Sequence, residues 1–101
     1  MADAILKLKD GTVYDDSDCG YSDRYIWCWL KNTTFSQAFA DFSDPQKTSE
    51  IHVIYGDHEI IYTGFTDLDM IRRSEYEPGK YTIDVRLTGN DIRIQEPGSP
   101  E

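Results

Sequence analysis

The chain has 101 residues and a formal net charge of −9, because 19 acidic residues outnumber 10 basic ones. This length fits one domain and supports a single core without disulfides or metals. The acidic balance argues against direct binding to nucleic acid, whose phosphates are held by Lys and Arg. No apolar run approaches the ~20 residues that span a membrane. Residues 1–15 show no secretory signal, so we expect a cytoplasmic location.

The first third of the chain predicts a hairpin, a loop and a buried strand. Residues 4–9 alternate like a strand, Asp10 and Gly11 suit a tight turn, and residues 12–14 return as a short strand. Residues 15–23 are polar and contain a glycine, so we expect a loop there. Residues 25–30 are six consecutive apolar or aromatic residues, which favours a central strand buried on both faces.

A short helix is predicted for residues 34–42. Its apolar positions recur at helical spacing and comprise Phe35, Ala38, Phe39 and Phe42. Thr34 and Gln37 form a capping-box pattern, and Pro45 ends the run. A helix of this length needs tertiary packing, because short isolated helices are marginal in water.

Residues 50–62 read as a second hairpin around Gly56 and Asp57. A two-residue loop pairs Tyr55 with His58 and continues to the pairs Val53–Ile60 and Ile51–Tyr62. The face that these six residues share is the better core face. We therefore predict that the helix packs on this hairpin, with Phe39 buried against Val53 and Ile60.

The remaining third predicts further strands. Residues 66–69 fit a helical turn or an irregular crossing, and residues 70–76 and 80–88 flank a Pro-Gly turn. The alternation in residues 81–87 predicts one solvated face. Residues 90–94 fit a short edge strand, and residues 96–101 have a disordered composition. The expected fold is α+β, with one short helix packed on a mostly antiparallel β-sheet that forms a single domain over residues 1–95.

No pattern in the sequence marks an enzyme or a metal site. The hairpin register places His52 and His58 on opposite faces, so they cannot act on one substrate. The acidic run from Asp15 resembles a calcium loop but has Ile26 where a bidentate acid is required. Cys19 and Cys28 lie nine residues apart, unlike the close spacing of structural zinc ligands. A site that combines them with a histidine and an Asp stays open, but we expect no enzyme activity, no cofactor and no metal.

The acidic residues are the remaining candidates for function. The candidate partner-binding residues are Asp15, Asp16, Asp18, Asp23, Glu75 and Glu77. The first four lie in a stretch without a basic residue. Such charge either keeps the protein soluble or steers it to a basic partner by imitating a nucleic-acid backbone.

In its small size, acidity, few cysteines and lack of a catalytic motif, the chain resembles small proteins encoded by phages and prophages of Gram-positive bacteria. The resemblance is one of type and carries over no site residue. One kind of such protein, the anti-CRISPR inhibitors, implies a non-enzymatic protein that blocks a basic nucleic-acid-handling partner, such as a CRISPR nuclease, in the bacterial host cell. The alternative is a phage structural or assembly protein of the head or tail.

Overall fold

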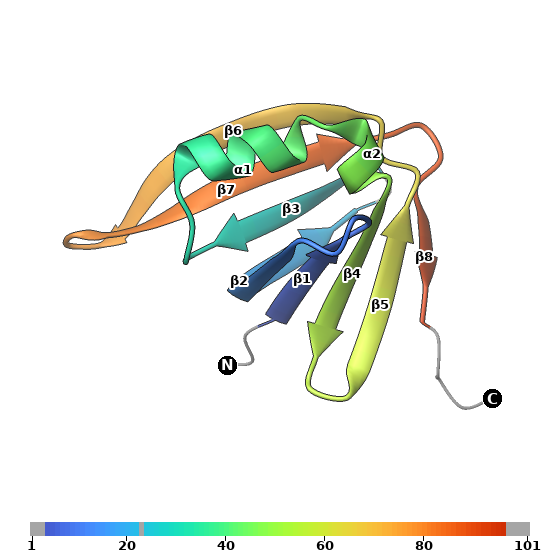
Figure 1. The fold of residues 1–101 in the computed structure, drawn as a ribbon, viewed down its shortest axis with the longest axis horizontal. Coiled ribbons are helices and arrows are strands. Elements are labelled where there is room, and N and C mark those ends of the chain that lie inside the picture. Colours follow the sequence, from blue (N-terminus) through green and yellow to red (C-terminus); the bar gives the residue numbers. More distant parts are fainter. Residues whose placement is uncertain (1–3, 23, 97–101) are drawn as a thin grey trace.

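The computed structural model describes residues 4–22 and 24–96, which form a predominantly antiparallel β fold with two short helices (Figure 1). The described elements, in chain order, are β1 (Ala4–Leu8), β2 (Val13–Tyr21), β3 (Tyr25–Leu30), α1 (Phe35–Phe42), α2 (Pro45–Thr48), β4 (Glu50–Tyr55), β5 (His58–Thr63), β6 (Asp67–Glu77), β7 (Lys80–Thr88) and β8 (Arg93–Gln95). Within these ranges, no helix has both the length and the apolar character that a membrane span requires. The predicted tail lies outside the described residues beyond Glu96.

The described strands form one twisted sheet in the order β6-β7-β3-β2-β1-β4-β5-β8, and every neighbouring pair is antiparallel (Figure 1). Two connections cross from one side of the sheet to the other: β5 to β6 and β7 to β8. They touch at Gly64 and Gly89, where a Cβ added to Gly89 would lie 2.1 Å from the Gly64 carbonyl oxygen. No side chain fits between the two connections at this point.

The core lies on one face of the sheet, where alternate residues of six strands meet the buried side of α1. Its fully buried strand residues include Leu6 and Leu8 of β1, Ile26, Cys28 and Leu30 of β3, Ile51 and Val53 of β4, and Val85 and Leu87 of β7. Burying a side chain of this kind contributes about 1.5–3 kcal/mol each. The opposite face of the sheet is only partly covered.

The predicted loop over residues 15–23 is wrong, because β2 continues through it to Tyr21. This segment pairs with β1 on one side and β3 on the other, which satisfies its backbone groups. A bulge shifts its register against β1, and Asp16 has a φ of 50°. The sequence pattern did not indicate a strand here, because the buried position in the middle of this segment is occupied by Ser17 rather than by an apolar residue.

The helix lies where predicted, and its first turn is capped by Thr34, whose Oγ1 accepts a 3.1 Å hydrogen bond from the Gln37 backbone N–H. The reciprocal half of the capping box is absent from the described hydrogen bonds. The Gln37 side chain instead donates to Asp41 Oδ2 at 3.1 Å.

The prediction that Phe39 is buried against the β4–β5 hairpin is wrong. Phe39 is 49% exposed and stacks on Phe35, with ring centroids 6.3 Å apart. The helix packs instead on β6 and β7, as Figure 1 shows. It is turned so that Ala38, Asp41 and Phe42 face inward, because this rotation brings the Asp41 carboxylate to its hydrogen-bond donors.

The predicted register of the β4–β5 hairpin is confirmed: Tyr55 pairs with His58, Val53 with Ile60 and Ile51 with Tyr62. The strands over residues 70–76 and 80–88 are also confirmed as parts of β6 and β7, and a short C-terminal edge strand forms as β8. Residues 66–69 are not a helical turn, since β6 already begins at Asp67.

Two predictions about solvent exposure are wrong. The central strand β3 is not buried on both faces, because Tyr25, Trp27 and Trp29 are only partly covered. In β7 the expected solvated face is buried at Asp84, whose side chain is enclosed by neighbours from β6 and β7. The burial of Asp84 follows from the side chains of Arg72 and Ser74, which reach from the edge strand β6 over the outer face of β7.

Candidate protein-binding surface

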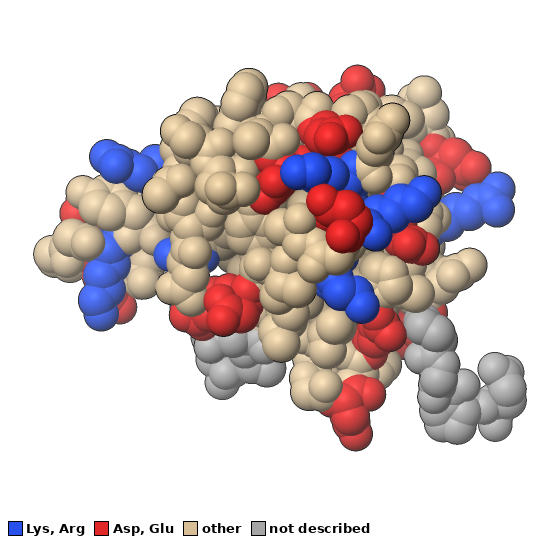
Figure 2. All heavy atoms as spheres, in the orientation of Figure 1, with Lys and Arg blue, Asp and Glu red and all other residues tan. Residues whose placement is uncertain are grey.

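The predicted acidic residues fall into two separate groups. Asp15, Asp16 and Asp18 lie on β2, whereas Glu75 and Glu77 lie at the far end of β6. Since β3 and β7 separate these strands, three interstrand spacings, or about 14 Å, lie between the groups. Asp23 lies outside the described residues. On the face shown in Figure 2, acidic side chains form several small groups with Lys and Arg side chains among them.

The two groups also differ in their local contacts. In the first, Asp15 Oδ1 accepts a hydrogen bond from Asn32 Nδ2 at 3.2 Å, and Asp18 Oδ1 accepts one from the Cys19 backbone N–H at 2.8 Å. Neither carboxylate forms an ion pair with a Lys or Arg among the residues described. In the second group, Glu77 pairs with Lys80 at 3.4 Å. Asp15 and Asp18 therefore keep more of their charge available to a partner than Glu77 does.

The outer face of the sheet carries a row of aromatic side chains on β3. Tyr25, Trp27 and Trp29 alternate with the buried residues of this strand and so point to the face opposite the core. The Trp27 and Trp29 rings are nearly parallel, at 8°, with centroids 6.1 Å apart. The Tyr25 ring meets Trp27 edge-on at 6.4 Å.

Two arginines from neighbouring strands lie against these rings. The Cζ atom of Arg86 lies 5.0 Å from the Trp27 ring centroid, and that of Arg72 lies 5.9 Å from it, both within cation–π range. Arg86 also pairs with Asp69 at 2.5 Å, and Arg72 pairs with Asp84 at 3.1 Å. We call Tyr25, Trp27, Trp29, Arg72 and Arg86 the aromatic face.

Asp84 fixes the position of the Arg72 side chain through a buried hydrogen-bond network. Its buried carboxylate accepts hydrogen bonds from the hydroxyls of Ser74 and Thr82, each at 2.7 Å, in addition to the bond from Arg72 Nε. A carboxylate with three donors is well satisfied despite its burial. The Arg72 guanidinium is thereby fixed beside the Trp27 ring.

The acidic residues of β2 border the aromatic face. We call Asp15, Asp16 and Asp18 the β2 acids. In the sheet register Asp18 lies opposite Trp29, which in turn lies opposite Asp84. Gly20 lies one row further along β2, and a Cβ there would meet the Trp29 ring at 3.4 Å. The indole therefore extends over Gly20, and Asp18 places a carboxylate at the rim of the aromatic rings.

The sequence predicted that Trp27 and Trp29 lie in a strand buried on both faces, and it did not single out Arg72 or Arg86. The arginines come from β6 and β7, more than 40 residues further along the chain. The sequence feature that could have identified them is the alternation of side chains within β6 and β7. This alternation places Arg72 on the outer face of β6 and Arg86 on the outer face of β7. Only the strand order shows that these faces adjoin β3.

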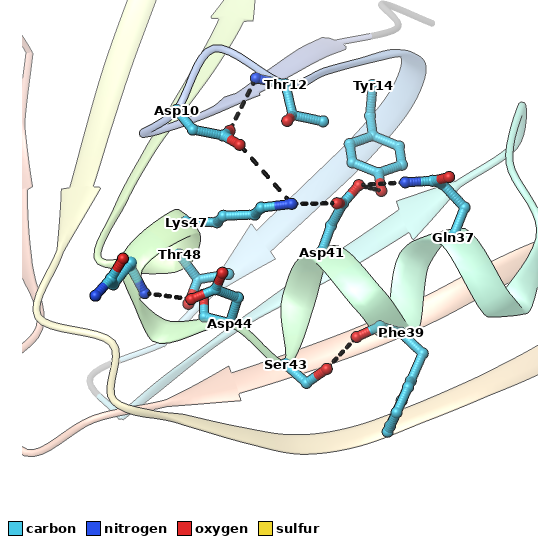
Figure 3. Close-up of polar contacts among 11 residues, drawn as sticks. Asp10, Thr12, Tyr14, Gln37, Phe39, Asp41, Ser43, Asp44, Lys47 and Thr48 are labelled. Atoms are coloured by element: carbon cyan, nitrogen blue, oxygen red, sulfur yellow. Dashed lines mark hydrogen bonds and ion pairs between the residues drawn. The ribbon is translucent and has the colours of Figure 1, made fainter.

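A second polar cluster lies under the helices (Figure 3). The buried Asp41 carboxylate accepts hydrogen bonds from the Tyr14 hydroxyl, from Gln37 Nε2 at 3.1 Å and from Lys47 Nζ at 2.9 Å. Burial tends to raise the pKa of Asp41, but these three hydrogen bonds outweigh it and leave the pKa lowered. Burial and the contact with Asp41 raise the pKa of Tyr14.

This cluster anchors α1 and α2 to β2, because its groups satisfy one another beneath the helices. An adjoining pocket of about 670 Å³ is lined by Lys9, Asp10, Asp44, Pro45, Gln46, Lys47 and Ser49. The Lys47 ammonium at its wall is already engaged by Asp41 and, at 3.8 Å, by Asp10. The arrangement offers neither a nucleophile beside a base nor an open metal position, and it is best explained as structural.

The two histidines lie on opposite faces of the β4–β5 hairpin, whereas the two cysteines lie together on β2 and β3. His52 pairs with Glu59 at 2.5 Å on the outer face, whereas His58 lies 3.4 Å from Glu96. No group of three or more His, Cys, Asp or Glu side chains in the described part of the chain is arranged to hold a metal ion. Cys19 and Cys28 are direct neighbours across β2 and β3.

Comparison of the chain with protein-family models, with curated proteins and with solved structures found no match.

Proposed function

We propose that this protein is a non-enzymatic inhibitor that docks its aromatic face and the β2 acids on a basic, nucleic-acid-binding surface of a larger protein. The observation that carries the proposal is the position of Asp18 beside Trp29, which joins acidic and aromatic recognition in one surface. A CRISPR nuclease in the cytoplasm of a bacterial host cell is the partner class that the sequence suggests.

The residue types of the aromatic face support a protein partner. Trp, Tyr and Arg dominate the binding energy of protein interfaces, especially where they are already held in place. Here Trp27 and Trp29 stack on each other and the two arginines are fixed by Asp69 and Asp84. Little side-chain freedom is left to lose when a partner binds.

The β2 acids support the nature of the partner. Protein surfaces that bind single-stranded nucleic acid combine cations for the phosphates with apolar or aromatic platforms for the bases. The carboxylates of the β2 acids are complementary to the cations of such a surface. The stacked indole rings are complementary to its apolar or aromatic platforms. Asp15 and Asp18, which have no Lys or Arg partner within the described chain, would find their counter-charges on such a surface.

The test is binding to a purified CRISPR nuclease with its guide RNA, together with inhibition of DNA cleavage. The variant Asp15→Asn, Asp16→Asn, Asp18→Asn removes three charges at nearly constant volume. We expect it to weaken binding by about tenfold or more and to reduce the salt dependence of association. The matched control is Glu75→Gln, Glu77→Gln, which should change binding much less.

A second pair of variants tests the aromatic face. Trp29→Ala should abolish inhibition, whereas Phe39→Ala, which removes an exposed aromatic residue on α1, should leave it intact. Melting temperatures are measured for every variant. Full inhibition by a folded Trp29→Ala variant, or binding that does not weaken at high salt, would contradict the proposal.

The open edge of the sheet favours the second candidate, a phage assembly protein. β6 has 11 residues and no described strand pairs with its outer side. Such an edge is a template for strand addition by another chain. Concentration-dependent self-association in sedimentation, without binding to any nuclease tested, would favour this candidate over the inhibitor.

A further inference from the structure

Cys19 and Cys28 occupy directly opposite positions on β2 and β3. Both are free thiols, and both point to the core face of the sheet, since their neighbours Asp18 and Trp29 lie on the outer face. Cys28 is fully buried, whereas Cys19 is partly exposed. Cys19 is therefore the more accessible residue of the pair, and Cys28 is enclosed beside it.

The hydrogen-bond pattern of the two strands fixes the geometry of the pair. The Ser22 N–H donates to the Tyr25 carbonyl at 2.9 Å, which makes residues 22 and 25 a hydrogen-bonded pair. Hydrogen-bonded and non-hydrogen-bonded pairs alternate along an antiparallel ladder. Three steps from this pair, Cys19 and Cys28 form a non-hydrogen-bonded pair.

Non-hydrogen-bonded pairs bring the side chains closest together, with Cα atoms about 4.5 Å apart. This spacing falls within the ~4.4–6.8 Å that a disulfide bridges. The thiols already interact: a hydrogen bond with Cys19 and burial together raise the pKa of Cys28. The register is therefore compatible with a disulfide between the two residues.

We propose that Cys19 and Cys28 are an oxidisable dithiol, which a small disulfide such as glutathione disulfide converts into a cross-strand disulfide. The thiolate of Cys19 attacks glutathione disulfide, and one glutathione leaves as its thiolate. The Cys28 thiol then loses its proton as its sulfur attacks the Cys19 sulfur, and the second glutathione leaves and takes up a proton. In sum, one glutathione disulfide is reduced to two glutathione molecules, and the two thiols lose two protons and two electrons.

The bond would join the strands that also carry Asp18 and Trp29. It would lie on the core side of β2 and β3, directly behind the border between acids and aromatic rings. Whether or not that surface binds a nuclease, the oxidised protein should be more resistant to unfolding, because the crosslink restricts the unfolded chain.

The experiment incubates the reduced full chain with glutathione redox buffers of increasing oxidising strength. We expect the intact mass to fall by two hydrogens, peptide mapping without reductant to link the peptides of Cys19 and Cys28, and Tm to rise by roughly 10 °C. The Cys19→Ser variant, altered at the partly exposed position, should show neither the mass loss nor the Tm rise.

Three results would overturn the proposal. They are two titratable thiols after full equilibration with glutathione disulfide, a stable glutathione adduct on Cys19 that Cys28 does not displace, and a disulfide that links two chains instead of closing within one. Because all readouts are chemical, they stand independently of any loss of nuclease inhibition.

Discussion

The carboxylate of Asp41 is enclosed by three donors from different parts of the chain: Tyr14 on β2, Gln37 on α1 and Lys47 on α2 (Figure 3). This residue determines which side of α1 faces inward. A buried charge is tolerated only when hydrogen bonds and counter-charge replace its lost hydration. The rotation of α1 that leaves two phenylalanines exposed follows from that requirement.

We predict that Asp41→Asn lowers the free energy of unfolding by about 1–3 kcal/mol, because the amide cannot pair with the Lys47 ammonium or accept all three hydrogen bonds equally well. Tyr14→Phe should cost about 1–2 kcal/mol by removing one donor. Urea denaturation of both variants and the double variant measures the coupling between the two residues. Additive losses would show that the Tyr14–Asp41 contact has no energetic importance.

Acid stability gives a separate prediction. The hydrogen bonds from Tyr14, Lys47 and Gln37 hold the folded-state pKa of Asp41 below the ordinary aspartate value of 3.8. As the pH falls, the Asp41 carboxylate is therefore protonated in the unfolded chain before it is protonated in the folded protein. The carboxylate therefore stabilises the fold above about pH 4, and this contribution is lost as the pH falls through the folded pKa. Asp41→Asn should lose less stability than the parent protein between neutral pH and pH 3, whereas the exposed turn variant Asp57→Asn should match the parent.

At the scale of elements, α1 carries both a buried and an exposed phenylalanine. Phe42 is 1% exposed and its ring lies 5.5 Å from that of Tyr14, whereas Phe39 is about half exposed. Phe42→Ala should cost about 3–5 kcal/mol, and Phe39→Ala should cost less than about 1 kcal/mol. Chemical denaturation of the two variants provides the comparison, and equal losses would contradict the observed rotation of the helix.

The same elements show what the sequence could and could not predict. The β4–β5 register followed from alternation around a two-residue turn, and both are local signals. The strand β2 was missed because Asp15 and Asp18 looked like loop residues, although their side chains lie away from the buried Ser17. The helix was located correctly, but its rotation depends on Tyr14, 27 residues before Asp41. Likewise, the aromatic face exists only because β7 lies beside β3.

At the scale of the whole molecule, the contact between Gly64 and Gly89 joins the two connections that cross the sheet. An added methyl group at Gly89 would lie far inside contact distance of the Gly64 carbonyl. We predict that Gly89→Ala costs about 2 kcal/mol or more, because backbone on both sides must move. A thermal scan tests this, and a loss below about 0.5 kcal/mol would mean that the connections separate easily.

The order of the strands also has a consequence for the time that the chain needs to fold. Leu6 pairs with Val53, 47 residues later, and Cys28 pairs with Val85, 57 residues later. Only the hairpins, such as β4–β5 and β6–β7, join neighbouring segments. Closing such long loops costs entropy before any contact compensates for it, so we expect refolding in milliseconds to seconds rather than microseconds. Trp27 and Trp29 lie on β3, whose pairing with β7 spans the longest separation along the chain. Stopped-flow fluorescence of the two indoles would therefore follow the slow formation of this pairing.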